Sequence, residues 1–395
     1  MSAVDVIDAG EAVERLGVSR ATLYAYVSRG LVRALPDTAD PRRSLYSAAD
    51  IDGLVTRKRR GRKPERIAAG TLDWGLPVLT SHITRIEGGQ LSYRGRDALE
   101  LAKVASFEAV AALLWGCGDS DPFAAPMPAV GDAWDELSRL MAARSLPERC
   151  GVLLPLMPGA SATLWRRELR LVWPNAATLL RTMAAAAVGR APRATPIAEV
   201  LAEAWGLEPG HASTDHLRAA LVLLADHELN ASAFAVRVVA STGASLAAAL
   251  TGGLAALGGP RHGGTTSLVE ILFDEIERAG DAGRVVDERL WRGDLLPGFD
   301  HPLYPDGDPR AVALLGRLPP DGERDSLIAA VGALGKRPNV DFALVSLRRA
   351  LGLPRGAAFT LFAVGRTAGW IAHALEQLAD GRLIRPRARY DDPEE

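Results

Sequence analysis

The chain of 395 residues has only two cysteines, Cys117 and Cys150, which excludes a disulfide framework and a four-thiolate zinc site. It also lacks the HExxH motif of zinc proteases, the GxSxG nucleophile motif and a P-loop, so we expect no metal site. Its start is acidic and lacks the basic-then-apolar pattern of a signal peptide. The formal net charge is −2, so the whole chain is no polycation that coats nucleic acid. These absences favour a cytoplasmic protein.

One long stretch without charge lies between Arg237 and Arg261. It is long enough to cross a bilayer, but Ala, Gly, Ser and Thr dominate it and Gly252-Gly253 interrupts it. We therefore expect two helices of small residues that pack closely against other helices, and no membrane partner.

The composition is that of a globular protein, with 48% hydrophobic and 24% charged residues. Apolar residues recur at three- and four-residue steps, which is helical periodicity, in residues 107–114, 176–187, 217–224 and 363–378. No alternating βαβ pattern is present, so the sequence predicts a mainly α fold. Turn signals within residues 72–93 predict one short β-hairpin.

Charge changes sign along the chain. The first 66 residues carry 13 basic and 9 acidic side chains, whereas the remainder carries an acidic excess. Such a shift indicates a domain boundary. The basic segment 57–66, in which Gly61 and Pro64 break helices, is the predicted linker.

The segment before this linker has the punctuation of a small helical module. Residues 11–16 form a helical stretch that stops at Gly17, and Ser19 is an N-cap for a second helix that ends at Gly30. Residues 42–46 read as a strand, and the capping box at residues 47–50 opens a third helix.

The strings LGVSRATLYAYVSRGLV and RRSLYSAADIDGL resemble the winged helix-turn-helix of MerR-type proteins, here residues 1–56. The resemblance implies DNA binding through Arg20, Thr22, Tyr24 and Arg29, with residues 57–66 adding phosphate contacts. DNA is then a partner of residues 1–66. The alternative is a small helical appendage that does not bind DNA.

The rest of the chain offers three groups suited to one kind of chemistry. Four glycines surround His262, so the backbone there bends tightly and leaves room for a ligand. His301 lies in the string LPGFDHPLY, and Asp341 follows Pro338 near the start of a helix. Two imidazoles, a carboxylate and several arginines suit enolisation beside a carbonyl, with arginines binding a small polycarboxylate.

Five strings in order resemble the citrate synthase family: ADHELNASAFAVRVVAST, GGPRHGG, LPGFDHPLYPDGDPR, KRPNVDFALVSLRRALGLP and GRTAGWIAHALEQLADGRLIRPRARY. The resemblance implies a helical large domain formed by residues 67–264 and 356–395. It implies a small domain formed by residues 265–355, which closes over the substrates. It further implies a homodimer and an acyltransferase of the tricarboxylic acid cycle type that needs no tightly bound cofactor.

By that resemblance, three residues carry the chemistry. Asp341 stands where the family's base removes a proton from the methyl group of acetyl-CoA. His262 stands where a histidine stabilises the enol oxygen, and His301 where one polarises the keto group of oxaloacetate.

The same resemblance implies four substrate-binding residues. His227 is a further oxaloacetate contact, and Arg310, Arg366 and Arg385 bind its carboxylates. In the family the last of these arginines reaches across from the partner subunit.

Asp300 departs from the family pattern, which usually has a glycine before the keto-binding histidine. A carboxylate there either raises the pKa of His301 and repels a dicarboxylate, or points outward without effect.

Two alternatives to a citrate synthase stay open. One is a 2-methylcitrate synthase that uses propionyl-CoA, because one methylene changes binding by only about 1–3 kcal/mol. The other is a DNA-binding regulator whose synthase-like body senses a ligand.

Overall fold

The protein is described by a computed structural model in which residues 6–28, 31–36, 40, 44–61, 79–160, 168–208, 211–388 and 390 are described. The chain divides into two compact units, Met1–Thr80 and Ser81–Glu395. The observed division, between Thr80 and Ser81, falls after the predicted linker of residues 57–66.

The first unit combines helices with a small sheet. Its elements are β1 (Val6–Ile7), α1 (Ala9–Leu16), α2 (Arg20–Ser28), β2 (Ala34–Pro36), β3 (Ser44–Ser47) and α3 (Ala48–Gly61). The strands are antiparallel in the order β1-β3-β2. Leu16, Leu23, Tyr46 and Ile51 belong to a core that is separate from the core of the second unit.

Local chemistry explains where these helices begin and end. The Asp8 carboxylate accepts hydrogen bonds from the first turn of α1, and Gly17 ends this helix in the left-handed region at φ 58°. The Ser19 hydroxyl accepts from the backbone N–H of Thr22, as its expected capping role requires. Gly30 and residues 41–43 lie outside the described residues, so the expected helix end and the start of the strand are not described.

The predicted linker is helical in its first half. Helix α3 continues to Gly61, so residues 57–61 belong to it, and residues 62–66 lie outside the described residues. The helix ends at Gly61, one of the two residues expected to break it, and Pro64 lies outside the described residues.

In its described residues the second unit is helical apart from one small antiparallel sheet, whose strands are β4 (Thr84–Glu87), β5 (Gln90–Tyr93) and β6 (Arg96–Asp97). Its helices are α5 (Ala98–Val104), α6 (Phe107–Trp115), α7 (Ala133–Leu140), α8 (Leu146–Leu153), η1 (Leu154–Leu156), α9 (Leu169–Ala187), α10 (Ile197–Ala204), α11 (Ala212–Leu224), α12 (Ala231–Ser241), α13 (Leu246–Leu257), α14 (Thr265–Ala279), α15 (Ala282–Arg292), α16 (Pro309–Leu315), α17 (Gly322–Gly332), α18 (Val340–Ala350) and α19 (Ala357–Asp380). The predicted mainly α fold, its four periodic helices and the hairpin are confirmed.

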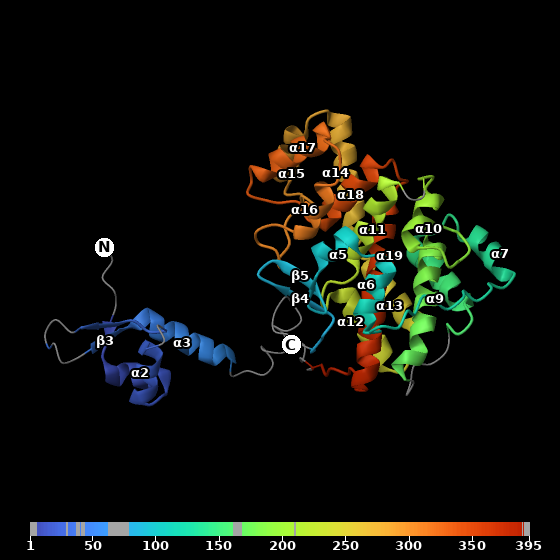
Figure 1. Ribbon diagram of the computed structural model, residues 1–395. Helices are drawn as coiled ribbons and strands as arrows, with labels where there is room; N and C mark the ends of the chain where they lie inside the picture. Colours follow the sequence, from blue (N-terminus) through green and yellow to red (C-terminus); the bar gives the residue numbers. More distant parts are fainter. Residues whose placement is uncertain are drawn as a thin grey trace. The chain divides into compact units, whose positions relative to one another are not determined.

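Helix α19 is the centre of this unit. It packs against α6, α9, α11, α12 and α13, and it runs through the middle of the bundle in Figure 1. Nearly all of its side chains are buried, which is why its sequence is apolar on every face. Gly369 allows close approach to the chain beside it, because a Cβ at this position would lie 2.3 Å from Asp226 Oδ1 and 2.4 Å from the Ala225 carbonyl oxygen.

Helices α14 to α18 contact one another within the unit, and α14, α16 and α18 also contact helices α5, α11 and α19. Contacts join α14 to α15 and α18, α15 to α17, and α16 to α18. This group is drawn in yellow to orange-red at the upper end of the unit (Figure 1). It covers most of residues 265–355, for which the sequence predicts a domain of its own.

The uncharged stretch 238–260 forms the end of α12 and the whole of α13. The expected pair of small-residue helices is confirmed, but the helix break is at residues 242–245, and α13 continues through Gly252-Gly253. Gly253 is needed for packing, since a Cβ there would lie 2.5 Å from a Val236 methyl and 3.1 Å from the Trp370 ring. Among the described helices, none is long and apolar enough to cross a membrane.

Candidate active site

The residues predicted to act together lie at helix ends and turns that meet beside α19. His227 follows α11, and His301 lies in the turn before α16. Arg310 is the second residue of α16, Asp341 is the second residue of α18, and Arg366 lies within α19. Segments far apart in the sequence thus supply one group of side chains.

An aromatic cluster holds two of the predicted histidines. His227 Nε2 and the Tyr304 hydroxyl are 3.0 Å apart, and both residues are buried. The rings of His227 and His301 lie edge to face with centroids 5.0 Å apart, and the His301 and Tyr304 centroids are 5.2 Å apart. Tyr304 is not among the residues predicted for the site, although it stands three residues after His301 in the quoted string.

A buried ion pair connects this cluster to α18. The Arg310 guanidinium donates to Asp308 through Nε at 2.9 Å and through Nη2 at 2.8 Å. Asp308 Oδ2 also accepts from the Val340 backbone N–H at 3.0 Å, at the start of the helix that carries Asp341. The arginine side chain lies over the Tyr304 ring at 5.3 Å. Asp308 is a further residue that sequence analysis missed, and it also caps α16 by accepting from the Arg310 backbone N–H.

Arg366 is a buried cation of a different kind. Its Nε donates to the Leu224 carbonyl oxygen at 2.9 Å, and its guanidinium lies 5.1 Å from the centroid of the Phe362 ring. No carboxylate of the described chain lies within ion-pair distance of it, in contrast to Arg310. Burial lowers the pKa of Arg366 to about 10, so it stays charged at neutral pH. A buried cation without a carboxylate partner favours an anionic ligand.

Asp341 begins α18 but does not cap it, because Asn339 is the N-cap and accepts from the backbone N–H groups of Asp341 and Phe342. Among the described residues, Asp341 Oδ1 is shielded from solvent and has no hydrogen-bond partner. Burial raises the pKa of Asp341 to about 7, and the charges of Arg310 and Arg366 oppose this shift only in part. The carboxyl group therefore titrates near neutrality, as a general base should.

His262 lies in a turn that only glycine neighbours allow. A Cβ at Gly263 would lie 2.8 Å from the Leu257 side chain, and one at Gly264 would lie 2.7 Å from the Gly259 carbonyl oxygen. His262 Nε2 is 2.9 Å from the hydroxyl oxygen of Ser232. This serine is the third site residue that the sequence analysis missed.

Electrostatics link the separated groups. Arg366 lowers the pKa of His227, His262, His301 and Asp341, which requires all of them to lie within reach of one charge. Burial is the larger cause for the histidines, and it lowers the pKa of His262 and of His301 to about 4. His227 lies well below its ordinary value for the same reason. All three imidazoles are therefore neutral at pH 7 and act as neutral hydrogen-bond groups.

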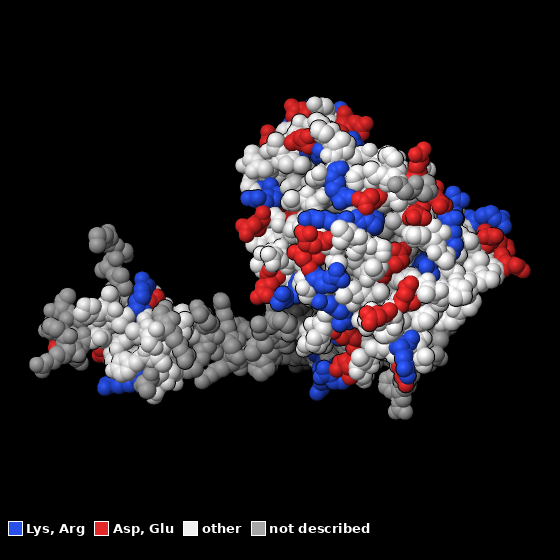
Figure 2. All heavy atoms as spheres, in the orientation of Figure 1, with Lys and Arg blue, Asp and Glu red and all other residues white. Residues whose placement is uncertain are grey.

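The arrangement suits a small anion beside a carbon acid. Asp308 pairs with Arg310, whereas Arg366 has no carboxylate within ion-pair distance among the described residues, although, against the larger effect of burial, the buried Asp226 carboxylate raises its pKa. No cluster of three or more metal-ligating side chains occurs among the described residues. On the face of the second unit shown in Figure 2, acidic and basic side chains are interspersed without a large field of one sign.

The remaining predicted residues lie elsewhere. Arg385 is exposed in the segment that follows α19, which ends at Gly381 with φ 69°. Arg20, Thr22 and Tyr24 lie on α2 of the first unit, and Arg29 is outside the described residues. The structure of the single chain thus brings six of the seven predicted enzyme residues to one region and leaves Arg385 apart.

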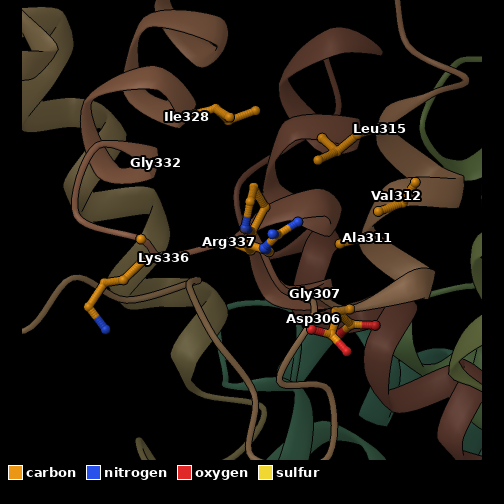
Figure 3. A pocket seen from close by; sticks show the side chains of 12 residues that line it. Asp306, Gly307, Ala311, Val312, Leu315, Ile328, Gly332, Lys336 and Arg337 are labelled. Carbon is orange, nitrogen blue, oxygen red and sulfur yellow. The ribbon is translucent and has the colours of Figure 1, made fainter. Parts of the chain in front are cut away.

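A cavity of about 400 Å³ lies next to this site, between α16, α17 and the turn at residues 335–338. Arg337 points into it, whereas the amino group of Lys336 extends away from it (Figure 3). Its lining shares Asp308 with the residues described above but contains none of the three histidines or Asp341.

Comparisons with known proteins agree with this arrangement. The profile of the family described as citrate synthase, C-terminal domain, matches residues 71–387. A citrate synthase from Haloferax volcanii is 34% identical over 357 residues, covering 80% of this chain and 94% of the relative. A 2-methylcitrate synthase from Shewanella oneidensis is 33% identical over 196 residues, covering 47% of this chain and 52% of the relative.

A solved structure agrees as well. The citrate synthase of Thermotoga maritima superposes with a TM-score of 0.69 at 27% identity, covering 81% of this chain and 95% of that one. Because the family profile, the similar sequences and the similar structure all agree, the chain belongs to the citrate synthase family of acyltransferases.

Proposed function

We propose that the protein is a citrate synthase that condenses acetyl-CoA with oxaloacetate and hydrolyses the resulting thioester. The observation that carries this proposal is the Asp341 carboxyl group, whose Oδ1 is shielded from solvent and whose pKa is raised to about 7, in a site with three neutral imidazoles and two buried arginines. A domain that only senses a ligand needs the cations but has no use for such a base.

Asp341 is the proposed base. Its carboxylate takes a proton from the methyl group of acetyl-CoA, and its raised pKa makes it a stronger base than an ordinary aspartate. The carbon acid remains weak, so the developing negative charge on the thioester oxygen needs a hydrogen-bond donor.

His262 is the proposed donor to that oxygen, and Ser232 contacts its ring through Nε2. The Ser232 hydroxyl donates to Asn230 Oδ1 at 2.7 Å, so towards His262 its oxygen accepts from Nε2–H at 2.9 Å. The Trp370 Nε1–H donates to the same hydroxyl oxygen at 3.1 Å and fixes its position. Donation from Nδ1 to the enol oxygen therefore requires the Ser232 hydroxyl to turn from Asn230 Oδ1 to His262 Nε2.

The oxaloacetate binds among the other polar groups. His301 donates to the keto oxygen, and His227 contacts the same molecule with its orientation fixed by Tyr304. Arg366 binds a carboxylate with its unpaired positive charge. Arg310 contributes the part of its guanidinium that Asp308 leaves available.

The enol carbon forms a C–C bond to the keto carbon of oxaloacetate, and the keto oxygen takes a proton to give citryl-CoA. Water then adds to the thioester, the C–S bond breaks, and the CoA thiol and citrate leave. Acyl-CoA is thus a co-substrate, and no tightly bound cofactor takes part.

Our proposal includes a large domain of residues 67–264 and 356–395 and a small domain of residues 265–355. Closure of the small domain over the substrates would exclude water from the enolisation step. It also includes a homodimer in which Arg385 completes the partner's site, which the exposed position of this arginine in the single chain supports.

Oxaloacetate-dependent release of CoA thiol by the full-length protein tests the activity, with the product identified by mass. We expect citrate from acetyl-CoA at a higher kcat/KM than 2-methylcitrate from propionyl-CoA. The reverse preference would establish the 2-methylcitrate alternative. No thiol release with either substrate, together with retained oxaloacetate binding, would establish a sensor.

We further propose that residues 1–56 are a MerR-type winged helix-turn-helix that binds DNA. Helix α1, the left-handed turn at Gly17 and helix α2 support this proposal, as does the antiparallel pair β2 and β3. Tyr24 is 55% exposed on α2, as a residue that contacts DNA should be. Arg20, Thr22 and Arg29 are the other proposed contacts, and the basic residues 57–66 add phosphate contacts.

A mobility shift of the full-length protein on random-sequence duplex DNA, at low and physiological salt, tests this second function. We expect binding that weakens steeply with salt and is reduced several-fold by Arg20→Ala. Absence of binding at low salt would leave the module as a helical appendage without a DNA-binding role.

A further inference from the structure

Asp300 has a backbone conformation that aspartate seldom adopts. Among the described residues, Arg94, Glu228 and Asp300 are the non-glycine residues with positive φ, and Asp300 has φ 58°. Such conformations cost free energy in L-residues and persist where the surrounding structure imposes them. Asp300 immediately precedes His301, so whatever holds it also holds the backbone of that histidine.

Hydrogen bonds hold Asp300 against the segment that precedes α18. Its Oδ1 accepts from the Arg337 backbone N–H at 3.0 Å, and its backbone N–H donates to the Arg337 carbonyl oxygen at 2.8 Å. The Asn339 side chain donates to the Asp300 carbonyl oxygen at 3.1 Å. The Asn339 backbone N–H donates to the Gly298 carbonyl oxygen at 2.8 Å.

These contacts join two segments that carry different parts of the chemistry. Asn339 is the N-cap of α18 and accepts from the backbone N–H of Asp341. The same asparagine therefore binds both the backbone next to His301 and the backbone of Asp341. A glycine at position 300 would leave the backbone bonds in place but remove the carboxylate that accepts from Arg337.

The Asp300 carboxylate is turned toward Lys336. Its Oδ2 is 2.6 Å from Lys336 Nζ, and the lysine side chain extends away from the neighbouring cavity (Figure 3). Asp308, not Asp300, is the carboxylate that opposes the lowering of the His301 pKa. The expectation that Asp300 raises the pKa of His301 is therefore wrong, because Lys336 and the Arg337 backbone bind its charge.

We propose that Asp300 is a positioning residue that fixes the His301 turn to the segment carrying Asp341, through its bond to the Arg337 backbone. The inference rests on the proposed function, since it assigns the two segments to one reaction. The exposed ion pair with Lys336 contributes little, and the bond to the Arg337 backbone is the side-chain contact that fixes main chain to main chain.

Two substitutions separate positioning from general stability. Asp300→Gly removes the strain at positive φ together with the side-chain acceptor, whereas Asp300→Asn keeps an oxygen acceptor and tolerates the left-handed region. We expect the glycine variant to unfold within a few degrees of the wild type yet lose about ten-fold or more in kcat. We expect the asparagine variant to stay within about three-fold of the wild type. Asp306→Asn, at an exposed acid in the following turn, is the matched control and should keep full activity.

Amide hydrogen exchange gives a readout that does not depend on activity. Peptides covering residues 298–304 and 335–340 should exchange faster in Asp300→Gly than in the wild type, and at near wild-type rates in Asp300→Asn. Wild-type kcat and wild-type exchange in the glycine variant would overturn the inference. If the wild-type protein is inactive but Asp300→Gly still exchanges faster than the wild type in these peptides, the proposed function is contradicted and the contact between the two segments is established.

Discussion

A single carboxyl group combines the two properties that matter most at the scale of the residue. Asp341 is shielded from solvent at Oδ1 without a hydrogen-bond donor among the described residues, and its pKa is raised to about 7. The same burial that makes it a competent base also disfavours its charged form. Function and stability therefore conflict at this position.

That conflict predicts a stability gain when the charge is removed. Between about pH 4 and 7 the folded state binds more protons at Asp341 than the unfolded state, so the stability of the wild type falls as pH rises through this window. Asp341→Asn lacks this loss, and we expect it to be more stable than the wild type at pH 8 by on the order of 2 kcal/mol. Thermal unfolding of both proteins at pH 4.5 and pH 8 measures this. A stability difference that does not change between the two pH values would contradict the raised pKa.

Sequence motifs predicted most residues of the candidate site, but the sequence did not predict the contacts between distant segments. His262, His301 and Asp341 stand in unusual glycine- or proline-rich strings, which made them visible. Asp308 is recognisable only after the fold places its carboxylate between Arg310 and the start of α18. Ser232 and Tyr304 likewise act through a partner many residues away.

At the scale of the element, α19 determines how closely the site segments approach. Its glycines let the chain at residues 224–227 lie directly against the helix, and Gly369 donates to the Ala225 carbonyl oxygen at 2.8 Å. Beneath this contact, Asp226 and His373 form a fully buried pair at 3.3 Å. Helix α19 thus fixes the backbone two residues before His227.

We expect Gly369→Ala to destabilise the protein by about 1–3 kcal/mol, because the new Cβ overlaps Asp226 and the Ala225 carbonyl oxygen. The displaced turn should also raise the KM for oxaloacetate through His227. Thermal unfolding and steady-state kinetics measure both effects.

Gly332→Ala, at the end of α17, is the matched control. A Cβ there meets nothing within 4 Å, so this variant should be neutral or slightly more stable. Equal stability of the two variants would contradict the close approach at Gly369.

Helical periodicity predicted the elements better than their ends. The four periodic stretches became α6, α9, α11 and α19, because apolar spacing reports which face is buried. The glycine pair at 252–253 did not break α13, since close packing against Val236 and Trp370 requires small residues there. Tertiary packing overrode local propensity at that position.

At the scale of the whole molecule, the single chain leaves Arg385 exposed and apart from the other site residues. If this arginine serves the partner's site in a homodimer, the Asp341→Ala and Arg385→Ala variants are each inactive but can complement each other. A mixed dimer has one site with both residues intact.

We expect an equal mixture of these two variants, after exchange of subunits, to recover about a quarter of wild-type activity. Half of the dimers are then mixed, and each contains one complete site. Each variant incubated alone is the control. If Arg385 acted within its own chain, no mixture would regain activity.

A single-turnover measurement with enzyme in excess over acetyl-CoA and saturating oxaloacetate tests the central role of Asp341 most directly. The account predicts that Asp341→Asn slows release of CoA by about 10²–10⁴-fold while oxaloacetate binding, followed by calorimetry, is retained. Release of CoA at the wild-type rate by this variant would contradict it.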